Sequence, residues 1–192
     1  MKRKYCILAI VLGLFVSACQ KKPVQNQAED SVQFNTTPIE ANVRFTCSQG
    51  EDPDTQKSLP TTYALINESK KAIIRWESDR FSTSGWNKEK RCQEIASRLE
   101  KAYNDRALNI ITNGKMNGQS VICTSLAAGG DCVDLLITIK PEDDALKIVK
   151  QFGEILNGSL IATRTDSASE AAQIYMDLNI EQFAQMPAFE EE

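Results

Sequence analysis

Alternation of apolar and polar side chains predicts seven short strands along the chain. In the first strand Val43, Phe45 and Cys47 share one face, while Arg44 and Thr46 lie on the other. The same period of two, or a short apolar run, recurs in six later segments. The predicted strands span residues 43–48, 63–66, 71–76, 108–112, 120–126, 132–139 and 174–180. For the last of these, two preceding alanines favour a helix as the alternative.

A second period, of three to four residues, predicts two main helices. Asn87 is placed to cap the first helix, which carries Cys92 on its apolar side. Pro141 and the three acids after it indicate the first turn of the second helix, and Gly158 fits its end. A short third helix follows the last strand. The predicted helices span residues 87–104, 141–158 and 181–186.

These elements predict an α+β fold. We expect an antiparallel sheet of about six to seven strands, with two main helices packed on one face, and two disulfides. Asn117-Gly118 has the chemistry of a type I′ turn and is the predicted hairpin tip. Gly114 is then predicted to mark a β-bulge. The order of the strands does not follow from the sequence.

The first residues have the pattern of a secretory signal. A cationic start precedes an apolar run that is too short to span a membrane. Val16-Ser17-Ala18-Cys19 looks like a bacterial lipobox, which predicts lipidation of Cys19; the alternative is an ordinary cleaved signal that ends near a cysteine. The predicted parts are a lipoprotein signal peptide at 1–18, a lipid-anchored flexible tether at 19–42, a single domain at 43–186 and an acidic tail at 187–192.

The charge balance argues against electrostatic partners. The chain has 22 Lys and Arg against 26 Asp and Glu, and loss of the three leader cations leaves 19 against 26, a net charge of about −7. Charge alone does not hold such a protein on nucleic acid or anionic lipid. We therefore expect no nucleic-acid partner, and membrane attachment through the N-terminal acyl chains.

Four cysteines remain after the leader and Cys19, and an even number outside the cytoplasm suggests disulfides. Three pairings are possible. Cys47 and Cys92 lie on the apolar sides of their strand and helix, whereas Cys123 and Cys132 flank one short loop. We therefore predict the pairs Cys47–Cys92 and Cys123–Cys132.

The inventory of reactive side chains excludes several classes of enzyme. The chain has no histidine, so it holds no Ser-His-Asp or Cys-His site and no imidazole metal ligand. P-loop, nucleophile-elbow and dinucleotide-binding glycine patterns are absent. Asp52 and Asp54 lack the further acids of a calcium loop. We expect no catalytic residue, metal or cofactor, with a hydrolase that uses a carboxylate pair or a Ser-Lys dyad as the alternative.

Five segments carry a resemblance to a known family: RFTCSQG (44–50), IIRWES (73–78), SGWNKEKRCQEIASRL (84–99), NGQSVIC (117–123) and CVDLLITIKP (132–141). In these segments the chain resembles the circadian oscillating polypeptide domain family of cyanobacteria. Lys88 stands where many members have proline. The resemblance implies an exported, membrane-associated cyanobacterial protein, and it brings no established activity, substrate or catalytic residue.

Arginine and aromatic side chains gather between the third predicted strand and the first long helix. Such groupings are typical of binding hot spots. The alternative is structural, with Trp76 in the core and Trp86 packed over the helix start under the stem of Arg91. The candidate binding surface consists of Arg75, Trp76, Arg80, Phe81, Trp86 and Arg91.

Together these patterns predict a lipid-anchored extracytoplasmic protein that acts as a non-catalytic binding or interaction module, and the family resemblance implies that it belongs to the cyanobacterial envelope or thylakoid. It would face the periplasm or the thylakoid lumen. Its partner would be a protein or a small molecule, and a small-molecule carrier would need an apolar cavity. An envelope hydrolase is the alternative function.

Overall fold

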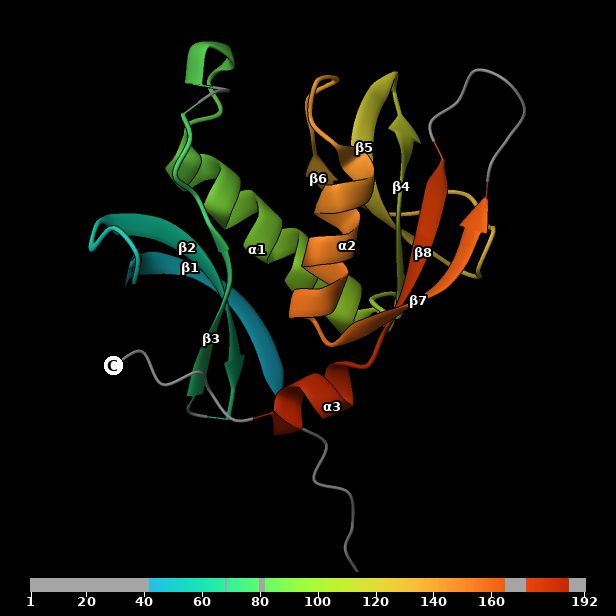
Figure 1. The fold of residues 1–192 in the computed structure, drawn as a ribbon. Coiled ribbons are helices and arrows are strands. Elements are labelled where there is room, and N and C mark those ends of the chain that lie inside the picture. Colours follow the sequence, from blue (N-terminus) through green and yellow to red (C-terminus); the bar gives the residue numbers. More distant parts are fainter. Residues whose placement is uncertain (1–41, 68, 80–81, 165–171, 187–192) are drawn as a thin grey trace, which may run out of the picture. The chain divides into compact units, whose positions relative to one another are not determined.

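The computed structural model of the chain describes residues 42–67, 69–79, 82–164 and 172–186 (Figure 1). The predicted leader, Cys19, nearly all of the tether and the acidic tail lie outside these residues, so lipidation and the domain boundaries stay predictions. Within the described ranges, no helix combines the length and the apolar character that crossing a membrane requires.

The described part of the chain holds eight strands in two antiparallel sheets. The strands are β1 (Val43–Glu51), β2 (Ser58–Ile66), β3 (Ser69–Arg75), β4 (Ile110–Met116), β5 (Gln119–Ser125), β6 (Leu135–Thr138), β7 (Gly158–Arg164) and β8 (Gln173–Leu178). The first sheet has the order β1-β2-β3, and the second has the order β6-β5-β4-β8-β7. The helices are α1 (Lys88–Asn104), α2 (Ala145–Ile155) and α3 (Ile180–Gln185), and a 3₁₀ turn spans Ser82–Ser84.

The predicted α+β class and both disulfides are confirmed. The sheet differs from the expected one, because the strands divide into sheets of three and five instead of forming one sheet of six or seven. After β3 the chain passes through α1, and the next strand, β4, pairs with β5 and β8 instead of returning to the first sheet.

Helix α1 begins as the sequence predicts and joins elements of both sheets. The side chain of Asn87 caps it by accepting a hydrogen bond from the Lys90 amide at 2.9 Å. Its buried side contacts β1 and β2 and also reaches β6. The Cys47–Cys92 disulfide ties the helix to β1 across a separation of 45 residues, and we call it the long-loop disulfide.

Helix α2 starts later than predicted. Its N-cap is Asp144, whose carboxylate accepts a hydrogen bond from the Lys147 amide at 3.0 Å. Pro141 lies in the preceding turn, so its assignment to the first turn of the helix was wrong. The helix approaches β8 closely at Gly153, where an added Cβ would lie 2.9 Å from the side chain of Met176.

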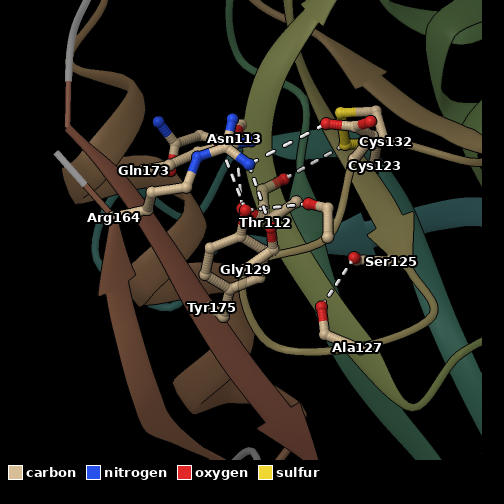
Figure 2. A network of polar contacts seen from close by, with 12 residues as sticks. Thr112, Asn113, Cys123, Ser125, Ala127, Gly129, Cys132, Arg164, Gln173 and Tyr175 are labelled. Atoms are coloured by element: carbon tan, nitrogen blue, oxygen red, sulfur yellow. Dashed lines mark hydrogen bonds and ion pairs between the residues drawn. A yellow bond between two sulfur atoms is a disulfide. The ribbon is translucent and has the colours of Figure 1, made fainter. Parts of the chain in front are cut away.

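The second disulfide, Cys123–Cys132, closes the loop 126–134 between β5 and β6, and we call it the short-loop disulfide (Figure 2). The loop is also held from β8, because the Tyr175 hydroxyl donates to the Gly130 carbonyl at 2.8 Å. Gly114 lies against this disulfide: a Cβ there would be 2.5 Å from the Cys132 sulfur. The pairing of β4 with β5 is regular at Gly114, so the predicted bulge was wrong and close packing explains the glycine.

The hairpin between β4 and β5 turns where the sequence predicts. Asn117 and Gly118 have φ values of 51° and 76°, as a type I′ turn requires.

On the other sheet, Lys71 joins β3 to α3, since its ammonium group donates to the Phe183 carbonyl at 2.5 Å. Burial lowers the pKa of this lysine.

Candidate functional site

A cavity of about 380 Å³ lies where α1, the segment after β3 and strand β6 meet. Three residues of the predicted surface line it: Trp76, Trp86 and Arg91. We call this cavity the tryptophan groove, and its main lining residues are Trp76, Trp86, Arg91, Ile95, Leu135 and Ile137.

Trp76 is a fixed wall of the groove. Only 8% of the residue is exposed, and its indole N–H donates to the Thr62 hydroxyl at 2.9 Å. Its backbone amide continues the β2–β3 pairing by donating to the Pro60 carbonyl. The structural alternative for Trp76 is therefore confirmed, because the side chain belongs to the core while one side of it meets the groove.

Arg91 covers Trp76 and not Trp86. Its guanidinium carbon lies 4.8 Å from the centre of the Trp76 ring, which is a cation–π distance, and the group donates to the Ser78 carbonyl. Burial lowers the pKa of Arg91, and the nearby Asp79 carboxylate acts in the opposite direction. A guanidinium nevertheless stays protonated in proteins, so a cation faces the groove.

Trp86 is the exposed member of the site, with 36% of the residue open to solvent. Gly85, at φ +79°, makes the turn that separates the 3₁₀ turn from the helix cap and brings Trp86 to the groove. The Lys90 ammonium lies 4.4 Å from the centre of its ring. Lys90, instead of the expected Arg91, is thus the cation packed on Trp86.

The remaining predicted residues lie elsewhere or are not described. Arg75 lies beside Asp52, with 4.0 Å between the Arg75 Nε and a carboxylate oxygen, and it lines neighbouring cavities instead of the tryptophan groove. Arg80 and Phe81 lie outside the described residues. The structure therefore assembles three of the six predicted residues around one cavity.

The sequence did not reveal the opposite wall of the groove. Ile95 comes from the buried side of α1, while Leu135 and Ile137 come from β6. Arg98 braces this wall: it donates to the Leu136 carbonyl at 3.3 Å and pairs with Glu94 at 2.9 Å. The spacing of Glu94 and Arg98 indicates a helix-surface pair, but nothing local shows that β6 lies beside it.

The groove is suited to hold an apolar group. Its walls are aromatic and aliphatic, and its charged members, Arg91 and the Glu94–Arg98 pair, are already engaged with protein groups. A volume of about 380 Å³ falls in the range of small-ligand sites, roughly 300–1,000 Å³. The cavity thus has mainly apolar walls and a polar margin.

Groups that would support other chemistry are placed as follows. No cluster of three or more metal-ligating side chains occurs among the residues that the structure describes. Lys115 and Ser120 face each other across the β4–β5 hairpin, but Lys115 is exposed, whereas a lysine that acts as a base is desolvated. The hydrolase alternative therefore stays a prediction without a specific observation in its favour.

Comparison with known proteins assigns the sequence to a family. The profile of the family described as Circadian oscillating protein COP23 matches residues 44–185, from β1 to the end of α3, which confirms the resemblance. No curated protein and no solved structure shows a significant match to the chain.

Proposed function

The chain belongs to the circadian oscillating protein COP23 family, and from that premise we propose that it is a binding module whose site is the tryptophan groove. The observation that carries the proposal is Trp86, a large aromatic side chain that stays 36% exposed at a cavity with apolar walls. Tryptophan and arginine are enriched among the residues that contribute most to binding at protein interfaces. The function is non-catalytic capture of a ligand or partner through an apolar group.

The proposal places this module outside the cytoplasm, anchored to a membrane by lipid on Cys19. The lipobox sequence supports the anchor, and the two disulfides support an oxidising compartment such as the periplasm or the thylakoid lumen. Mass spectrometry of the mature N-terminus tests the anchor directly. An unmodified terminus at any residue other than Cys19 would refute it.

Site-specific photo-cross-linking in native membranes tests the binding role. A photoreactive amino acid at position 86 should capture a defined partner, whereas the same group at Ile161, which is 44% exposed on β7, should not. Trp86→Ala should then weaken binding of the purified partner roughly thirtyfold. The substitution should change the free energy of unfolding by less than about 1 kcal/mol, because the side chain is partly exposed.

The two measurements separate a binding site from a structural one. Loss of partner binding with stability intact supports the site. A large loss of stability in Trp86→Ala would show that Trp86 is structural and would refute the proposal. Equal capture from positions 86 and 161 would show that capture is not specific to the groove and would refute it as well.

A further inference from the structure

Strand β3 is an edge strand. It is the outermost strand of the first sheet, where one side pairs with β2 (Figure 1). Among the described residues no strand pairs with its other side. Such an edge presents a row of backbone N–H and C=O groups that can template another strand. With seven residues, β3 offers an edge roughly 23 Å long.

The space beside this edge is hollow. Two cavities of about 370 and 730 Å³ adjoin β3, and every residue from Lys71 to Trp76 lines one or both of them. Successive side chains of a strand point to opposite faces of its sheet. The register of β3 shifts at Ile73, but on either side of it each cavity still meets neighbouring residues, Lys71 and Ala72 in the larger and Arg75 and Trp76 in the smaller, so both cavities lie along the edge of the strand. We call these two cavities the strand trench.

The far side of the strand trench carries more apolar than polar side chains, although Asp143, Gln151 and Glu154 also line it. Helix α2 supplies Ile155 to both cavities, and 44% of this residue is exposed. Phe152 of α2 and Ile139, just after β6, line the smaller cavity. A strand laid along β3 would thus have backbone partners on one side and apolar side chains on the other.

The strand trench continues into the tryptophan groove. Trp76, Arg91 and Ile137 line both the smaller trench cavity and the groove. An extended chain in the trench would therefore bring its end to Trp76 and Trp86. A long acyl chain would match the apolar wall, but it would leave the polar edge of β3 without hydrogen bonds, so an extended peptide fits better.

We propose that an extended segment of a partner protein, with alternating apolar side chains, binds in the strand trench as a fourth strand beside β3. This inference rests on the proposed function, since it names the partner of the same site. Main-chain hydrogen bonds to β3 supply affinity, and the apolar wall and the tryptophan groove select the side chains.

The test uses peptides selected from a displayed library of random 12-residue sequences against the full-length chain in lipid nanodiscs. The tightest peptide is then N-methylated at alternate residues in two complementary sets. In a strand only every second N–H faces the neighbouring edge. One set should therefore weaken binding at least tenfold and the other less than twofold. Equal effects of both sets would overturn strand addition.

A matched pair of variants tests whether the peptide binds in the strand trench. Ile155→Lys puts a charge on the trench wall and should weaken peptide binding at least tenfold, whereas Ile161→Lys, at a residue of equal 44% exposure on β7, should change it less than twofold. Equal behaviour of the two variants would overturn the assignment to the trench. Sedimentation adds a further check: self-association that Ile155→Lys abolishes would assign the trench to a second copy instead.

The failure of this inference is distinguishable from failure of the proposed function. Peptides that lose binding in Trp86→Ala but respond equally to both methylation sets would overturn strand addition and support binding at the groove. A selection that yields no specific peptide would overturn strand addition, while capture from position 86 tests the groove independently.

Discussion

The two disulfides should contribute unequally to stability, and the difference follows from the lengths of the loops they close. The perturbation is a pair of double variants: Cys47→Ala with Cys92→Ala, and Cys123→Ala with Cys132→Ala. A disulfide stabilises the fold chiefly by restricting the unfolded chain, more so for a longer loop. The two bonds close separations of 45 and 9 residues.

The loop-entropy relation converts these separations into free energies of about 4 kcal/mol for the long-loop disulfide and about 2.6 kcal/mol for the short-loop disulfide. Packing does not reverse the order, because one cysteine of each pair, Cys92 or Cys123, is fully buried. Truncation to alanine thus leaves a similar small void in both variants. We expect the long-loop variant to be less stable by about 1.5 kcal/mol.

Urea denaturation followed by tryptophan fluorescence measures both losses, since Trp76 is buried in the native state. The dependence of the unfolding free energy on urea should be compared as well, because loss of a cross-link can expand the unfolded chain. An equal or larger loss in the short-loop variant would refute the entropic reasoning. It would show instead that the contacts of the loop 126–134 depend on its disulfide.

Three further changes probe single contacts. Gly114→Ala should cost about 1–3 kcal/mol in urea denaturation, because its Cβ would clash with the short-loop disulfide, and should cost much less in the variant without that bond. The Thr55 hydroxyl and amide donate to Asp52 and lower the pKa of this carboxylate below 3.8. The wild-type protein should therefore be more stable than Asp52→Asn above pH 3.8, and this advantage should vanish as the pH falls through the folded pKa. Thermal unfolding of both proteins across that pH range checks this. Trp76→Phe removes the bond to Thr62 and should cost about 1–3 kcal/mol, measured by circular dichroism in urea.

The local periodicity of apolar residues predicted much of the fold. The apolar spacing of α1 predicted its buried side, and the Asn87 cap predicted its start to the residue. Both disulfide pairs followed from local patterns, since each cysteine lies on an apolar side or at the end of one short loop. These features depend on residues close in sequence, which is why they were readable without the structure.

Strand β7 was missed because its sequence lacks the signals of a half-buried strand. Leu160 and Ile161 are adjacent, both are exposed, and the pairing with β8 shifts register between Leu160 and Ala162. An edge strand with a bulge does not alternate in period two. The division into two sheets was also hidden, because the pairing of β4 with β8 joins segments more than sixty residues apart.

In the candidate site, too, the sequence predicted the residues that are close in the chain and missed those that the fold brings together. Trp76, Trp86 and Arg91 were predicted together because they are close in sequence, and the structure places all three on one cavity. The wall from β6 was missed, since Leu135 and Ile137 meet the tryptophans only through the packing of the second sheet beside α1. The sequence therefore predicted the residues of one wall, and the fold supplied the cavity.

The tryptophan groove depends on the long-loop disulfide through a short chain of contacts. Trp76 donates to the Thr62 hydroxyl at 2.9 Å, and that hydroxyl lies 3.5 Å from the carbonyl of Cys92, the residue tied to β1. Arg91, which covers Trp76, is the residue that precedes Cys92 on the helix. The bond that holds α1 on the first sheet therefore lies next to the contacts that hold Trp76 and Arg91 in their wall of the groove. Because β6 packs against the same helix, the groove exists only where both sheets are in place, and binding there should report on the integrity of the whole fold.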